Sequence, residues 1–282
     1  SKRECVSGEY KNLVLVEDTC SGLQETANYY RGKLEAKIIG ITGSWGKTTT
    51  KELLASILSG EKNTYKSPGN FNTEYGLPIS LLEMDEGSEY GVFELGLQYP
   101  GDIKELSSIL KTDAAIVTGI GKVHVENFSD RKEMAREKME LPLSVPQGGE
   151  IVLNGDVDIL RDFDLGKKER SFYGIEKDED YFCSAKRVEL SGIEGSTFII
   201  ACEGQEMKIE IDLLGRGNIY NSLAAISMAR LLGVEWPEVK AGLKISPLSQ
   251  RLNPIKFPNG IVLDDSYNAN PVSVRAAIDI VS

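Results

Sequence analysis

The sequence predicts an α/β fold built on a central, mostly parallel sheet, with a β-hairpin region appended to it. Three observations support this fold class. Nearly all-apolar runs at residues 38–42, 90–95 and 114–118 are typical of buried parallel strands, and helical patterns separate them. A glycine-rich turn at residues 43–46 connects the first run to the helical pattern that follows. Two alternating segments within residues 196–212 indicate a hairpin.

The chain is expected to divide into three units. Residues 1–36 would end an N-terminal domain, with a short strand at 13–16 and a helix at 23–34. Residues 37–249 contain the alternating strands and helices of a central domain. Residues 250–282 would begin a C-terminal domain that is truncated here, because one strand and one helix cannot bury their apolar faces alone.

The remaining elements follow from hydrophobic spacing and composition. Apolar residues three and four positions apart predict helices, and a segment rich in Pro, Ser and Asn predicts a linker. The expected elements are helices at 48–58, 77–82, 100–110, 131–140 and 222–232, a linker at 246–258, a strand at 260–265 and a helix after Pro271.

Composition describes an ordinary soluble globular protein of 282 residues, with 41% hydrophobic and 27% charged residues. The net charge of −11 argues against sequence-independent binding of nucleic acid. No apolar run approaches the roughly 18 residues of a membrane span, and the N-terminus lacks a signal-peptide pattern, so we expect no integral membrane segment. Cys5, Cys20, Cys183 and Cys202 are scattered, which favours reduced thiols in a cytoplasmic protein.

The glycine-rich turn after the first strand has the composition of a phosphate cradle, or P-loop. Gly43 and Gly46 allow sharp turns that expose backbone N–H groups, and the N-terminus of the following helix favours anions. Lys47 can reach β- and γ-phosphate oxygens, and the hydroxyl of Thr48 suits Mg²⁺. The loop departs from the G-x-x-x-x-G-K-[ST] pattern because Ile41 stands where its first glycine is expected. A glycine turn that binds no ligand is the alternative interpretation.

Three chemically capable residues follow the expected strands. Glu94 ends one strand, where a carboxylate faces the crevice in which open α/β sheets bind ligands, and it could hold Mg²⁺ together with Thr48. His124 lies past the end of the next strand, at the same crevice. Lys138 belongs to a charged helical stretch; as a desolvated neutral amine it could react with CO₂ to give a metal-binding carbamate. The alternatives are that Glu94 is a solvated acid at a strand end, that His124 is a surface or packing residue, and that Lys138 is a lysine on the helix surface.

Asparagine-rich segments supply further candidates. Asn70, Asn72, Thr73 and Glu74 form a polar loop that could either cap the next helix or contact a polar substrate.

Later in the chain, Asn218 or Asn221 could cap a helix or bind a ligand. The segment at residues 264–271 ends a strand, where it could recognise adenine or ribose or simply form an Asx-rich turn.

Together these motifs resemble those of the Mur ligases, the ATP-dependent amide-forming ligases of peptidoglycan synthesis. The resemblance covers roughly residues 10–282 and rests on four segments: TGSWGKTTTKE at 42–52, NFNTEYG at 70–76, ELG with PGDI within 94–103, and DSYNANP at 265–271. The last segment is most similar to the MurF type, the UDP-N-acetylmuramoyl-tripeptide–D-alanyl-D-alanine ligases.

The resemblance implies a role for each matching residue. ATP would be bound by Gly43, Ser44, Gly46, Lys47, Thr48, Thr49, Asn221, Arg251, Asp265 and Asn268. The muramoyl-peptide would contact Asn70, Asn72, Thr73 and Glu74. Mg²⁺ would be held by Thr48, Glu94, His124 and Lys138, the last as a CO₂-derived carbamate, and Lys47, Lys138 and His124 would be catalytic. Arg251 lies in a segment, SQRLN, that departs from the family's Gly-Arg with an acid two residues on.

The resemblance further implies a P-loop ATPase domain followed by a Rossmann-like domain, and a reaction through an acyl phosphate. Its substrates would be ATP, UDP-N-acetylmuramoyl-tripeptide and D-alanyl-D-alanine, in a cytoplasmic monomer. Two alternatives stay open: another Mur-type or folylpolyglutamate-synthase-like ligase, and a non-catalytic ATP-binding module. The turn at residues 268–271 favours the MurF type, since MurE-type chains tend to carry a histidine there.

Overall fold

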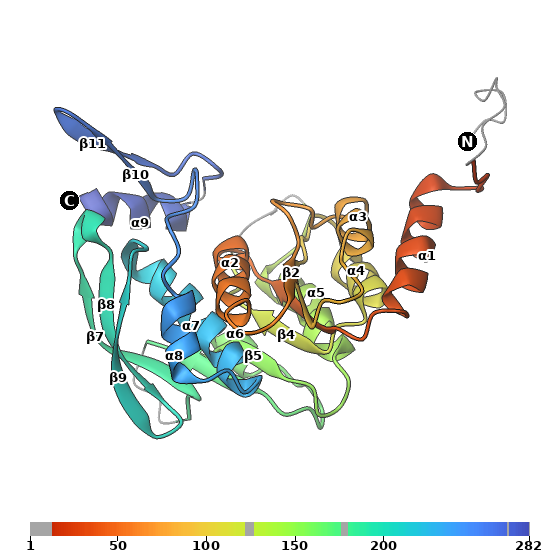
Figure 1. The fold of residues 1–282 in the computed structure, drawn as a ribbon, viewed down its shortest axis with the longest axis horizontal. Helices are drawn as coiled ribbons and strands as arrows, with labels where there is room; N and C mark the ends of the chain where they lie inside the picture. Colours follow the sequence, from red (N-terminus) through yellow and green to blue (C-terminus); the bar gives the residue numbers. More distant parts are fainter. Residues whose placement is uncertain (1–12, 122–126, 176–179, 270, 282) are drawn as a thin grey trace.

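The computed structural model describes residues 13–121, 127–175, 180–269 and 271–281 (Figure 1). Its helices are α1 (Thr19–Arg31), α2 (Lys47–Leu58), α3 (Gly76–Leu82), α4 (Asp102–Leu110), α5 (Arg131–Ser144), α6 (Asp158–Arg161), α7 (Gly215–Leu231), α8 (Trp236–Gly242) and α9 (Pro271–Val281), with a 3₁₀ turn η2 (Gly192–Glu194). Its strands are β1 (Lys37–Thr42), β2 (Thr64–Lys66), β3 (Tyr90–Glu94), β4 (Ala114–Val117), β5 (Ile151–Asn154), β6 (Ser171–Gly174), β7 (Cys183–Leu190), β8 (Ser196–Cys202), β9 (Gln205–Ile211), β10 (Asn253–Phe257) and β11 (Gly260–Asp264).

One large sheet organises the chain, with the strand order β2-β3-β1-β4-β5-β6-β7-β8-β9. Its strands are parallel from β2 to β7, and β7, β8 and β9 then run antiparallel. The α/β class, the mostly parallel sheet and the appended hairpin, β8 with β9, are therefore confirmed. Figure 1 shows α1 projecting at the N-terminal end and the small β10–β11 sheet with α9 at the C-terminal end.

Two hydrophobic cores lie on opposite faces of this sheet, because successive residues of a strand point to opposite faces. In β1, Ile39 and Ile41 belong to one core and Ile38 to the other. The first core contains apolar residues of α2, α7 and α8, and the second contains those of α3, α4 and α5. Helices thus cover both faces, which explains why the strands read as nearly continuous apolar runs.

The carboxyl ends of β1, β3 and β4 meet at one edge of the sheet. In the register Ile41 lies beside Glu94, and Thr42 lies beside Val117. The spatial order of strands departs from the chain order here, and ligands of open α/β sheets bind at such a position. The glycine turn, Glu94 and the residues that follow β4 are therefore brought together.

Two expected elements at the ends of the chain are wrong. Residues 13–16 form no strand; Val14 is 82% exposed, and no strand among the described residues pairs with the segment. Residues 253–257 are not linker but β10, paired antiparallel with β11 from Asn253–Asp264 to Phe257–Gly260. The Pro, Ser and Asn content of the segment predicted a linker, yet an edge strand tolerates a proline such as Pro254 because one side of it needs no ladder hydrogen bond.

The expectation of four reduced thiols is also wrong for two of them. Cys183 of β7 and Cys202 of β8 are directly opposite in the antiparallel register, with Cα atoms 4.3 Å apart, and they form a disulfide. This proximity could not be read from the sequence, because β7 itself was not expected as a separate strand.

Among the described residues, no helix combines the length and the hydropathy that crossing a membrane requires.

Candidate active site

The glycine turn between β1 and α2 depends on residues without side chains. Gly46 is the N-cap of α2 and has a φ of 77°, a left-handed conformation that strains other residues. A Cβ atom at Gly46 would collide with Oδ1 of Asn221, which lies in α7. At Gly43, a Cβ would collide with Oγ1 of Thr118. The turn can therefore lie close to both the β4 end and α7.

The neighbouring segment after β4 fixes the same turn. Ser44 N donates to Gly119 O at 2.9 Å, and Gly121 N donates to Ser44 Oγ at 2.9 Å. The indole of Trp45 packs across Gly119 and Gly121, where any Cβ would meet its ring. The two glycines after β4 thus have a structural reason, which is to admit this tryptophan.

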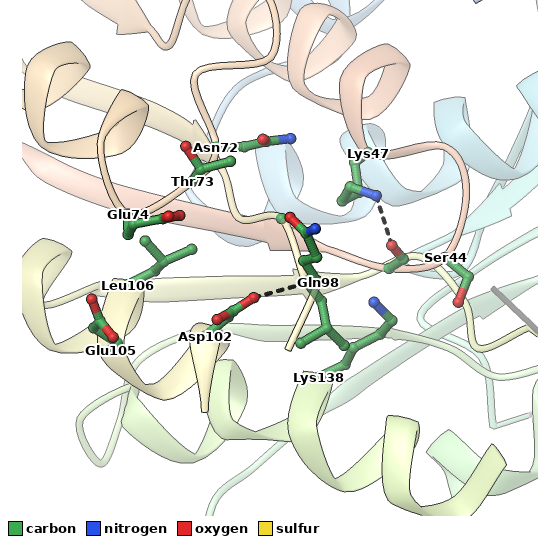
Figure 2. A pocket seen from close by; sticks show the side chains of 13 residues that line it. Ser44, Lys47, Asn72, Thr73, Glu74, Gln98, Asp102, Glu105, Leu106 and Lys138 are labelled. Carbon is green, nitrogen blue, oxygen red and sulfur yellow. Dashed lines mark hydrogen bonds between the residues drawn. The ribbon is translucent and has the colours of Figure 1, made fainter. Parts of the chain in front are cut away.

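Two lysines point into the space beside the turn, the buried Lys138 and the partly buried Lys47 (Figure 2). Lys47 Nζ donates to Gly43 O at 2.8 Å; burial lowers the pKa of Lys47, Glu94 opposes the shift and Arg251 adds to it. Lys138 is only 2% exposed, and burial, followed by repulsion from Lys47, lowers its pKa well below its ordinary value. Within the described part of the chain, no residue accepts a hydrogen bond from Lys138. The surface-lysine interpretation is therefore wrong.

Thr48, Glu94, Asn72 and Arg251 form one hydrogen-bonded cluster. Thr48 Oγ1 donates to Glu94 Oε2 at 2.7 Å, and Asn72 Nδ2 donates to Glu94 Oε1 at 2.8 Å. Arg251 Nη2 donates to Thr48 Oγ1 at 3.0 Å. Glu94 is 3% exposed, so it is not a solvated strand-end acid. The pair of oxygens from Thr48 and Glu94 at the start of α2 is the kind of ligand set that Mg²⁺ prefers.

A cavity of about 520 Å³ lies on the α7 side of the turn. Its lining includes most of the residues expected to bind ATP, namely Ser44, Gly46, Lys47, Thr48, Thr49, Asn221, Arg251, Asp265 and Asn268. The residues from the C-terminal part are held by local contacts: Leu252 N donates to Asp265 Oδ1 at 3.2 Å, and the Arg251 guanidinium lies 3.9 Å from the Tyr267 ring centroid. Burial raises the pKa of Asp265.

The two asparagines of α7 are not helix caps. The helix begins at Gly215 rather than near residue 222, so both lie inside it. Asn221 Nδ2 donates to Asn218 Oδ1 at 2.9 Å, and Asn218 Nδ2 donates to Leu214 O at 2.9 Å. These bonds leave Asn221 fixed against Gly46 at the wall of the cavity.

A second cavity of about 200 Å³ lies on the other side of the turn, toward α3 and α4 (Figure 2). It is lined by Gly43, Ser44, Lys47, Asn72, Thr73, Glu74, Gly96, Leu97, Gln98, Asp102, Glu105, Leu106 and Lys138. Ser44, Lys47 and Asn72 line both cavities. The glycine turn therefore separates two chambers, and Lys47 lines both.

Most of the expected site residues are brought to one of the two chambers. Asn70 is not: it is exposed and lines neither, and its carbonyl instead accepts from Asn72 N at 2.7 Å. His124 lies outside the described residues. Four lining residues were not expected from the sequence: Gln98 and Leu106 line the smaller chamber, and Arg216 and Tyr220 line the larger one. Gln98 shortly follows the end of β3, and Arg216 and Tyr220 lie near the start of α7, so these positions were the available signal. Leu106 lies in the middle of α4 and carried no such signal.

Comparisons with known proteins agree with this arrangement. The profile of the Mur ligase middle domain matches residues 41–229. The chain is 34% identical over 270 residues to the UDP-N-acetylmuramoyl-tripeptide–D-alanyl-D-alanine ligase of Bacillus subtilis, covering 95% of this chain and 58% of that protein. The ligase of the same name from Escherichia coli is 31% identical, with 95% and 60% covered.

Solved structures give the same result. MurF from Acinetobacter baumannii superposes with a TM-score of 0.88 at 30% identity, covering 95% of this chain and 59% of that one. MurF ligase from Thermotoga maritima, solved in complex with ADP, gives a TM-score of 0.86 at 28% identity, with 98% and 64% covered. The chain thus spans about three fifths of these relatives. The strand–turn–helix, the two chambers and the matched middle domain lead to one conclusion: the chain belongs to the Mur ligase family.

Proposed function

We propose that this chain is the ATP-binding part of a ligase that joins D-alanyl-D-alanine to UDP-N-acetylmuramoyl-tripeptide. The proposal rests on the glycine turn at residues 43–46, which we call the phosphate turn: it separates the two chambers, and Lys47 beside it lines both. A nucleotide in the larger chamber would present its terminal phosphate toward the smaller one. Relatives of 31–34% identity over 95% of the chain bear the name of this activity.

The larger chamber suits ATP. Backbone N–H groups at the start of α2, together with Lys47, would bind the β- and γ-phosphates. Asn221, Asp265 and Asn268 supply amide and carboxylate groups for adenine and ribose, and Arg251 lies close enough to Thr48 to reach the phosphate end. The smaller chamber would take the muramoyl-peptide, with Asn72, Thr73 and Glu74 at its wall.

The residues present fit Mg²⁺. Thr48 Oγ1 and Glu94 Oε2, 2.7 Å apart, would hold one ion, which supplies positive charge to the phosphate oxygens. Lys138 fits a carbamate, because a buried amine with a lowered pKa has a free lone pair; the amine adds to CO₂ and releases a proton. The carbamate and His124 would then bind a second ion.

Charge neutralisation is the main task of the site, since two anions must approach each other. The terminal carboxylate of the tripeptide attacks the γ-phosphorus, and the bond to the β-phosphate oxygen breaks, which gives an acyl phosphate and ADP. Lys47 lies between the chambers and would stay with the phosphoryl group as it moves. The amine of D-alanyl-D-alanine then attacks the acyl carbon, loses a proton and expels phosphate.

The setting of the reaction follows from its substrates. Because ATP and UDP-linked precursors are cytoplasmic, we place the reaction in the cytoplasm. We propose a monomer, since residues of one chain line both chambers. The net charge of −11 argues against a nucleic-acid partner.

The test is phosphate release by the full-length protein with ATP and UDP-N-acetylmuramoyl-tripeptide, adding one amine at a time. We expect turnover with D-alanyl-D-alanine and little with single amino acids such as glutamate, lysine or diaminopimelate. Turnover that requires a different amine would instead assign another ligase of the family. ATP binding without turnover under any combination would favour a non-catalytic ATP-binding module.

A further inference from the structure

Lys51 is a buried cation that the proposed reaction does not use. It lies in α2, one turn after Lys47 and Thr48, and its exposed fraction is 0%. A charged group so deeply buried is costly unless it is fully paired. Its position therefore calls for a reason other than helix packing, which an apolar side chain would serve at lower cost.

The ammonium group of Lys51 donates hydrogen bonds to the backbone of the segment that follows β2. Its Nζ donates to Ser67 O at 2.6 Å and to Gly69 O at 3.1 Å, and it lies 3.4 Å from Glu52 Oε1. The two carbonyls accept hydrogen bonds from the ammonium group, and the Glu52 carboxylate pairs with its charge. The two carbonyls flank Pro68, which has no N–H of its own to hold the chain in place.

The segment that Lys51 holds leads into the smaller chamber. We call residues 67–76 the substrate loop, because Asn72, Thr73 and Glu74 within it line that chamber. Ser67 is also bonded to β3: its N donates to Val92 O at 3.0 Å, and its Oγ accepts from Glu94 N at 3.3 Å. Further along, Asn72 O accepts from Gly96 N at 2.8 Å. Lys51 is thus the anchor of the loop's first part on the phosphate-binding helix.

We propose that Lys51 is a positioning residue that couples the substrate loop to the phosphate-binding helix, so that the two chambers keep a fixed separation. It touches neither chamber: it is absent from the lining of both, whereas Lys47 and Thr48 on the same helix line the nucleotide chamber. Through Ser67 it also supports Glu94, whose backbone is bonded to Ser67 at the start of the loop and whose side chain is bonded to Asn72 in its middle. This role in substrate placement rests on the proposed function, whereas the anchoring itself does not.

The test compares Lys51→Met with Arg230→Met. Met keeps the length of the apolar stem but cannot donate. Arg230 is the matched control, since it also bonds a carboxylate and a backbone carbonyl, Glu203 Oε2 and Val234 O, but far along α7 from both chambers. Hydrogen exchange is measured on peptides that cover the substrate loop, without any substrate. We expect Lys51→Met to speed exchange there at least tenfold more than elsewhere, and Arg230→Met to leave it within twofold of the wild type.

The full-length enzyme gives the second readout. Lys51→Met should raise KM for the muramoyl-peptide at least tenfold and KM for ATP less than threefold, while Lys51→Arg restores part of the difference. Unchanged loop exchange in Lys51→Met, or equal acceleration in Arg230→Met, would overturn the anchoring. Faster loop exchange with an unchanged KM for the peptide would overturn the coupling. If the wild type forms no product, the proposed function fails, while the exchange result still decides the anchor. If Lys51→Met does not fold, Lys51→Gln, which keeps one donor group, takes its place in both measurements.

Discussion

Replacing Gly46 by alanine tests the phosphate turn directly. The φ of 77° costs a residue with a Cβ about 1–2 kcal/mol. The new methyl group would also displace Oδ1 of Asn221, against which it collides, and so disturb the Asn221–Asn218 hydrogen bond, worth about 1 kcal/mol. Together these terms come to about 2–3 kcal/mol. The turn can escape the strain by moving, but bound nucleotide requires its N–H groups in place. ADP affinity should therefore fall by about 30- to 150-fold, since 1.4 kcal/mol is a factor of ten.

Gly101→Ala is the matched control for this prediction. Gly101 is also the N-cap of a helix, α4, with a φ of 98°, but a Cβ there meets nothing within 4 Å. Both variants introduce backbone strain, because both glycines have a positive φ, and only Gly46→Ala adds the collision at the nucleotide chamber. ADP binding can be followed by the fluorescence of Trp45 in a Trp236→Phe background, since the chain has two tryptophans. ADP affinity of Gly46→Ala within threefold of the wild type, or an equal loss in Gly101→Ala, would show that the collision with Asn221 does not control nucleotide binding.

Three further predictions concern the groups around the turn. Glu94→Gln should raise the Mg²⁺ concentration needed for half-maximal ATP binding at least tenfold, because a charged ligand beside Thr48 becomes neutral; an unchanged Mg²⁺ dependence in a titration contradicts the metal assignment. Asn72→Ala should raise KM for the muramoyl-peptide more than KM for ATP in steady-state assays, since its side chain holds the substrate loop to Glu94; equal changes argue against this. Lys138→Met should unfold at a higher temperature than the wild type at pH 7 in CO₂-free buffer, and the difference should shrink toward pH 10.5. The sign follows because burial lowers the pKa of Lys138, so that the unfolded chain binds more protons and wild-type stability rises with pH. A difference of opposite sign, or one independent of pH, contradicts it.

The sequence predicted the parts of the site that short segments encode. An apolar strand, two glycines and Lys47-Thr48 lie within a few residues, so the phosphate turn could be recognised from local pattern alone. Glu94 could be placed because the carboxyl ends of parallel strands share one edge. Hydrophobic spacing also predicted α2 and α7; α2 begins one residue before the expected start, whereas α7 begins at Gly215, seven residues before residue 222.

What the sequence could not reveal depends on contacts between distant segments. Lys51 looks like an ordinary polar position of a helix until the carbonyls of residues 67 and 69 are placed against it. Cys183 and Cys202 become neighbours only once β7 pairs with β8. The split into two chambers likewise arises because α7 and α4, far apart in the chain, lie on opposite sides of Lys47.

Isotope transfer tests directly whether a phosphoryl group crosses the turn to a peptide carboxylate. UDP-N-acetylmuramoyl-tripeptide labelled with ¹⁸O in its terminal carboxylate is incubated with the full-length protein, ATP and D-alanyl-D-alanine. An acyl phosphate retains a carboxylate oxygen on phosphorus when the amine expels it, so the released phosphate should carry one ¹⁸O atom for each amide formed. Unlabelled phosphate accompanying amide formation would show that the amide forms without transfer of the phosphoryl group to the carboxylate.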